Sequence, residues 1–210
     1  MRFSQTTKRI AAGVMLFALI ATGVALGASG PADGVRSAPE PASLKQGEKE
    51  RLMYLREREK LARDLYRRFH DTWQQPIFKR IAETRQRQFE SVELLLHWYQ
   101  LEDPAGENRA GVFTDAKLRQ RYAELTERGE SSKLAALRLA ARMEEKDVSA
   151  MLDAMVTSRQ WDIVMVYETL MSASRNSLEN LVRELQFLGH GYRPQEFAES
   201  EFYALFDPEV

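Results

Sequence analysis

Cysteine is absent from the 210 residues of the chain, which excludes disulfides, thiol nucleophiles, zinc–thiolate sites and cysteine-ligated iron–sulfur clusters. Histidine is scarce, with three in the whole chain, so a metal site would depend mainly on carboxylate ligands. An excess of charge is also missing, because 30 basic and 31 acidic residues leave a net charge of −1. The chain lacks the strongly basic character of nucleic-acid-binding domains, and we expect no nucleic-acid partner.

Local motifs for common enzyme classes are missing as well. The sequence contains no G-x-G-x-x-G segment, no P-loop and no G-x-S-x-G nucleophile elbow. It also shows no internal repeat. What it does contain is 44% hydrophobic and 29% charged residues, the composition of a globular domain. The sequence therefore favours one folded domain without an evident catalytic motif, although an enzymatic role stays open.

The N-terminal segment, residues 1–28, has the features of an export signal. Basic residues precede an uncharged apolar run from 10 to 28, which ends in small residues. Cleavage after Gly27 predicts a mature protein in the periplasm or outside the cell. In the alternative, the segment is not cleaved and residues 10–28 anchor the protein in the inner membrane. We expect membrane association only in this case. Residues 29–42, rich in Pro, Gly, Ala and Ser, are predicted to be a flexible linker.

Apolar residues then recur at alternating steps of three and four, the period of helices that pack in a bundle. This predicts an all-α fold in which an antiparallel four-helix bundle spans residues 43–192. A long crossover between the second and third bundle helices contains a short helix, and residues 193–210 form a short C-terminal helix and tail. The expected helix starts are Ser43, Pro76, Thr114 for the short helix, Ser131 or Ser132, and about Asp162; we expect the first helix to end near His70 and the short one at Gly129.

Polar residues interrupt the apolar seams near the middle of the four long helices. An isolated buried carboxylate costs several kcal/mol, so these side chains are expected to meet one another. Their layout is that of di-iron carboxylate bundles, in which two helices supply a Glu and two supply a Glu-x-x-His pair. Here the two pair positions read Arg-x-x-Gln and Ser-x-x-Ser. The six residues are Glu59, Arg85, Gln88, Glu144, Ser174 and Ser177.

Several stretches carry a family resemblance: EKLARDLY, PIFKRIAE, YQLEDPAG, GVFTDAKL, MEEKDV and YETLMSASRNSL. From about Leu52 to Tyr192 the chain resembles the bacterial ferritin-like family catalogued as domain of unknown function 2202, a rubrerythrin-like four-helix bundle. This resemblance implies a ferritin-like fold. It also implies a Glu-Gln-Arg-His segment where this chain has RQRQ at 85–88, and a Ser-Arg-Asn-His segment where it has SRNS at 174–177.

Carried over residue by residue, the resemblance leaves Glu59 and Glu144 as possible metal ligands, with Glu145 adjacent but off the seam. We therefore expect a degenerate di-iron site and no cofactor. A guanidinium supplies five donors and a fixed positive charge. We hypothesise that Arg85 bridges the first two carboxylates and that Gln88, Ser174 and Ser177 satisfy the remaining acceptors. In the alternative, Glu59, Glu144 and Glu145 bind iron or manganese.

These patterns favour an exported, non-catalytic structural or binding module with an unidentified protein partner. A diverged metal-dependent oxidoreductase or iron-handling protein is the alternative. The charged run from Arg56 to Arg68 is expected to be the solvated face of the first helix. The C-terminal aromatics are expected to pack a short helix onto the bundle or else to form a partner patch; they are Phe197, Phe202, Tyr203 and Phe206.

Overall fold

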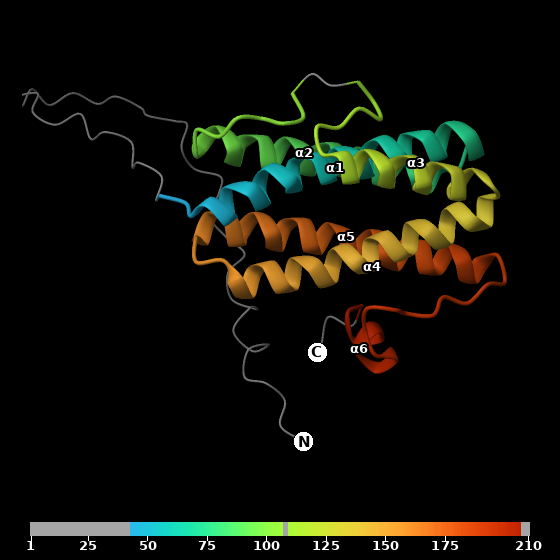
Figure 1. Cartoon of the computed structure of the whole chain (residues 1–210). Helices are drawn as coiled ribbons and strands as arrows, with labels where there is room; N and C mark the ends of the chain where they lie inside the picture. Colours follow the sequence, from blue (N-terminus) through green and yellow to red (C-terminus); the bar gives the residue numbers. More distant parts are fainter. Residues whose placement is uncertain (1–42, 107–108, 207–210) are drawn as a thin grey trace, which may run out of the picture. The chain divides into compact units, whose positions relative to one another are not determined.

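A computed structural model describes residues 43–106 and 109–206, and every regular element in these ranges is a helix (Figure 1). The prediction of an all-α fold is confirmed. The predicted signal and linker, residues 1–42, lie outside the described residues. The helices are α1 (Gln46–Trp73), α2 (Pro76–Trp98), α3 (Ala116–Glu130), α4 (Lys133–Thr157), α5 (Trp161–Phe187) and α6 (Glu199–Ala204).

The helix starts follow ordinary capping chemistry, with two shifts from the sequence-based boundaries. Pro76 opens α2 as predicted, and Ser132 caps α4 by accepting a hydrogen bond from the backbone N–H of Ala135 at 3.1 Å. The cap of α1 is Lys45 and not Ser43. The cap of α3 is Asp115 and not Thr114, because the Asp carboxylate accepts hydrogen bonds from two backbone N–H groups of the first turn.

Gly129 does not end α3, as the sequence had suggested, because the helix continues to Glu130. The glycine is required by packing. A Cβ atom at position 129 would lie 2.1 Å from the ring of Phe69 on α1. The close approach is also fixed by Trp73, whose indole N–H donates to the carbonyl oxygen of Gly129 at 3.0 Å.

The four long helices form two hairpins, α1 with α2 and α4 with α5 (Figure 1). The α3 helix lies in the connection between the hairpins and packs on α1 and α4, while α2 contacts α5. None of the helices within the described ranges combines the length and the apolar run that crossing a bilayer requires.

Two hydrophobic clusters fill the space between the long helices. One contains Phe69, Phe78 and Leu181 and extends under α3; the other contains Leu52, Val92 and other residues toward the opposite end of the same helices. Between the two clusters lie the six polar residues of the seams, which we call the polar layer. All six are buried: Glu59, Arg85, Gln88, Glu144, Ser174 and Ser177.

Most of the charged face of α1 is buried, so the expectation of a solvated face was wrong except at its end, where Arg67 and Arg68 are exposed. The segment between α2 and α3 covers it and supplies partners. Arg56 hydrogen-bonds to Asp103 at 2.8 Å and stacks on the Phe89 ring, while Lys60 donates to the carbonyl oxygen of Arg109 at 2.7 Å. Within α1, Asp64 forms ion pairs with both Lys60 and Arg63. The buried charged residues of this face are Arg56, Glu57, Lys60, Arg63 and Asp64.

The C-terminal segment returns to the bundle through its aromatic residues. Phe202 is fully buried and contacts the rings of Tyr192 and Phe206, with centroids 5.6 Å and 5.1 Å apart. Phe197 packs against the same hydrophobic cluster, whereas Tyr203 stays about half exposed. Phe197, Phe202 and Phe206 thus pack the segment around α6 against the hydrophobic core as expected, whereas Tyr203 does not.

Candidate functional site

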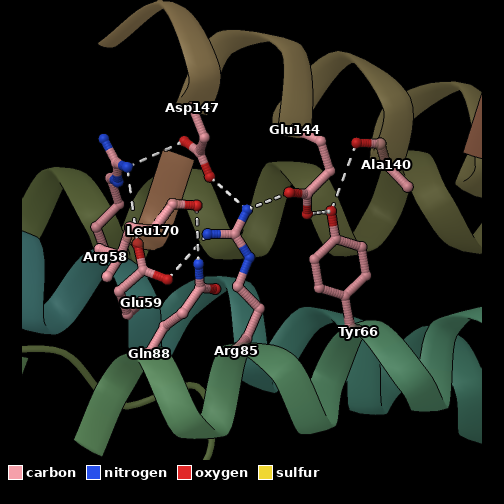
Figure 2. Close-up of polar contacts among 9 residues, drawn as sticks. All are labelled: Arg58, Glu59, Tyr66, Arg85, Gln88, Ala140, Glu144, Asp147 and Leu170. Carbon is pink, nitrogen blue, oxygen red and sulfur yellow. Dashed lines mark hydrogen bonds and ion pairs between the residues drawn. The ribbon is translucent and has the colours of Figure 1, made fainter. Parts of the chain in front are cut away.

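The centre of the polar layer is a cluster of three residues from three helices. Arg85 extends from α2 toward α4 and meets carboxylates on both sides (Figure 2). Its Nη1 donates to Glu59 of α1 at 2.9 Å, and its Nη2 donates to Glu144 of α4 at 2.6 Å. The exposed fraction of each side chain is at most 1%. The guanidinium therefore lies between the two carboxylates and hydrogen-bonds to both.

Asp147 and Arg58 extend this cluster toward the surface. Asp147 follows Glu144 by one helical turn and accepts a second hydrogen bond from Nη2 of Arg85 at 2.6 Å. Arg58 lies 3.3 Å from Asp147 and 3.7 Å from Glu59 (Figure 2). Neither residue was predicted from the sequence as part of the cluster. The i,i+3 spacing of Asp147 from Glu144 was the signal that would have placed Asp147 on the same helix face.

Tyr66 of α1 is a further polar partner of the cluster. Its hydroxyl donates to Glu144 at 2.6 Å and lies 3.4 Å from the carbonyl oxygen of Ala140. Burial and the adjacent carboxylate raise the pKa of Tyr66 well above its ordinary value. The phenol therefore keeps its proton and remains a donor to Glu144.

Gln88, Ser174 and Ser177 do not take their expected role, because within the described ranges no hydrogen bond joins any of them to Glu59 or Glu144. Gln88 donates to the carbonyl oxygen of Leu170 on α5 at 3.1 Å and not to a carboxylate of the cluster. Within the described ranges, the buried hydroxyl of Ser174 and one oxygen of Glu59 have no hydrogen-bond partner. The hydrogen bonds to these carboxylates come instead from Arg85, which donates to Glu59 and Glu144, and from Tyr66, which donates to Glu144.

Glu145 is buried but belongs to a different set of contacts. Its carboxylate accepts hydrogen bonds from the hydroxyl of Tyr192 at 2.6 Å and from the backbone N–H groups of Gln195 and Glu196 at 2.7 and 2.8 Å. Three donors from the segment after α5 thus hold this carboxylate. The structure does not bring Glu145 together with Glu59 and Glu144.

The cluster carries more negative than positive groups. Three carboxylates, those of Glu59, Glu144 and Asp147, face the guanidinium groups of Arg58 and Arg85. Burial opposes the charge on Arg85, but the three carboxylates together raise its pKa well above the ordinary value. Burial also raises the pKa of Glu144, and the positive charge of Arg85 offsets this only in part. The arrangement thus keeps Arg85 charged.

A dinuclear metal centre does not fit this set of side chains. The carboxylates of Glu59 and Glu144 each bind Arg85. The third candidate ligand, Glu145, is held by the segment after α5, and no histidine belongs to the polar layer. In the part of the chain that the structure describes, no three His, Asp or Glu side chains are grouped to hold a metal ion. A metal ion between Glu59 and Glu144 would also face the fixed positive charge of Arg85.

Fold and site together define an all-helical protein with a Glu–Arg–Glu cluster buried between its long helices. The chain belongs to the family described as "Uncharacterized protein domain (DUF2202)", which matches residues 48–208.

Two comparisons extend this assignment. The chain is 37% identical over 159 residues to "Uncharacterized protein MJ0754" of Methanocaldococcus jannaschii, a match covering 76% of this chain and 86% of that protein. A crystal structure titled as hypothetical protein MJ0754 from Methanococcus jannaschii is similar in fold. Its TM-score is 0.76 at 36% identity, and the match covers 80% of this chain and 97% of that one.

Proposed function

We propose that this protein is an exported, non-catalytic structural or binding module of the ferritin-like type, in which Arg85 takes the place of a metal centre. The observation that carries the proposal is the pair of hydrogen bonds from one guanidinium to Glu59 and Glu144. These are the two carboxylates that the family resemblance leaves as ligands. A buried fixed cation supplies the charge neutralisation that metal ions would otherwise provide.

The ferritin-like part of the proposal rests on the order and pairing of the helices. Four long helices pair as α1 with α2 and as α4 with α5, and the longest connection runs between these pairs. Ferritin-like bundles share this pattern of two hairpins joined by one long crossover. The polar layer lies at mid-length of the four helices, the level at which such bundles hold their metal ligands.

A restored ligand set tests the proposal directly. The variant carrying Arg85→Glu, Gln88→His and Ser177→His replaces the cation and introduces the ligands that the resemblance implies. Both full-length proteins are titrated with Fe(II) in the absence of oxygen. The wild type should show no saturable iron binding, whereas the variant should bind iron stoichiometrically. Equal stoichiometric binding by the wild type would contradict the proposal and favour an iron-handling protein.

Export is proposed on the basis of the N-terminal sequence alone. Sequencing the N-terminus of protein purified from its natural host should give a chain beginning at Ala28, in a periplasmic or extracellular fraction. An intact N-terminus in the membrane fraction would instead support anchoring by residues 10–28. Recovery of the intact chain from the cytoplasm would contradict both forms of export.

A further inference from the structure

A groove with basic walls opens between α3 and α4, beside the turn that joins them. Its volume is about 740 Å³, within the range of ligand-binding sites. The segment after α5 forms the third wall. The chain has 30 basic residues, and six of them line this one groove: Arg121, Arg128, Arg138, Arg142, Lys146 and Arg193.

These six cations are poorly neutralised. Glu124 is the one acidic residue among the described residues that line the groove, although the chain has 31 acids in all. Five of the six cations form no ion pair with any other described residue. The exception is Arg142, which lies 4.0 Å from Glu196 and has a buried Nη1 without a hydrogen-bond partner. The groove therefore attracts anions, and an anionic ligand would relieve the repulsion among its walls.

The base of the groove is apolar. Leu125 of α3 and Leu139 and Met143 of α4 line it, and all three are otherwise buried in the core. Tyr192 contributes a partly buried ring from the third wall. A ligand that fills this site would have to present apolar groups as well as negative charge.

The cations on α4 are spread along a line. Arg138, Arg142 and Lys146 follow one another at intervals of four residues, which places successive charges about 6 Å apart along the helix axis. In an extended peptide, side chains two residues apart point the same way and lie about 6.7 Å apart, while the residue between them points to the opposite side. A row of acids can therefore match the row of cations while alternate apolar residues face the base.

We propose that this basic groove binds an extended acidic peptide of a partner protein, in which acidic and apolar residues alternate. This inference rests on the proposed function as a binding module and names the chemistry of its partner. Recognition by an Arg-rich wall and an apolar base follows the modes that other peptide-binding modules use. The groove shares no residue with the Glu59–Arg85–Glu144 cluster.

The probe is a fluorescent synthetic peptide of alternating Glu and Leu, about ten residues long so that it spans the groove. Fluorescence anisotropy with the full chain should show saturable binding that weakens as salt is raised. The Arg138→Glu, Lys146→Glu double variant should weaken binding about tenfold or more, because both side chains are exposed and their reversal repels the peptide. A peptide of alternating Glu and Ser should bind more weakly than the Glu–Leu peptide.

A matched variant, Lys79→Glu with Arg80→Glu, makes the same change in net charge on exposed residues of α2 and should bind within about twofold of the wild type. Absence of saturable binding by the wild type, or an equal loss in this control, would overturn the proposal. Tighter binding of oligothymidylate or polyphosphate would overturn it in favour of a phosphate polymer. Failure here leaves the metal titration unchanged, so the two proposals are tested separately.

Discussion

Arg85 hydrogen-bonds to carboxylates from two helices, so its removal changes the charge balance of the polar layer directly. Buried ion pairs are not by themselves strong stabilisers, because desolvation cancels much of the attraction. Breaking such a pair from one side is different, since it leaves buried charge without a partner. Replacing Arg85 by an uncharged residue therefore tests whether the guanidinium stabilises the fold.

We expect Arg85→Met to lower the free energy of unfolding by about 3 to 5 kcal/mol, because Glu59 and Glu144 lose their shared cation. Urea denaturation followed by circular dichroism measures this change. Arg80→Met is the matched control, since Arg80 lies on the same helix and is exposed, and its effect should stay within about 0.5 kcal/mol. Equal stability of the two variants would show that the cluster does not depend on the guanidinium.

Gly129 lets α3 pack closely against the Phe69 ring of α1. The Gly129→Ala variant should lose about 1 to 3 kcal/mol of stability despite the better helix propensity of alanine, because the new methyl group meets the Phe69 ring. Gly47→Ala in α1, where nothing lies within 4 Å of the added atom, should not destabilise. Thermal unfolding of both variants provides the comparison. A stabilised Gly129→Ala protein would contradict the close packing of α3 on α1.

At the scale of elements, Asp103 connects the segment after α2 to α1. Burial alone would raise the pKa of Asp103, but hydrogen bonds from Arg56 and from the backbone of Ala105 and Gly106 outweigh it and lower the pKa below its ordinary value. A carboxylate with a lowered pKa in the folded state stabilises the fold above its unfolded pKa. This stabilisation is lost as the pH falls through the folded pKa.

Asp103→Asn should therefore destabilise the protein at neutral pH by about 1.5 to 3 kcal/mol, the range for hydrogen bonds to charged groups. The difference from the wild type should shrink as the pH falls below about 4, near the unfolded pKa of an Asp. Urea unfolding at a series of pH values measures it. Glu102→Gln, at an exposed neighbouring position, should show no such trend, and a constant Asp103→Asn effect across the series would contradict the linkage.

The elements could be predicted largely from sequence because amphipathic period and capping residues are local signals. The starts of α2 and α4 were predicted on that basis. The burial of the charged face of α1 could not be predicted in the same way. Lys60 and Arg56 look solvated until the segment after α2 supplies Arg109 and Asp103 as partners, and those contacts join residues almost fifty positions apart.

Across the whole molecule, the positions of the polar layer and the contacts of Arg85 with Glu59 and Glu144 were predictable, but the contact of Gln88 with Leu170 was not. Seam spacing places Glu59, Arg85 and Glu144 at the same level, since facing helices share a register. The orientation of Glu145 toward the C-terminal segment was not predictable, because the backbone donors that hold it come from an irregular stretch. Function was less predictable still, because a fold supports many activities and the site decides among them.

In the proposed function, the guanidinium of Arg85, and not metal ions, neutralises the facing carboxylates of Glu59 and Glu144. The most direct measurement is the iron and manganese content of the full chain, purified from its natural host without chelators, by elemental mass spectrometry. Both metals should be present at far below one ion per chain. Stoichiometric iron or manganese, lost when Glu59→Ala and Glu144→Ala are combined, would contradict the proposed function.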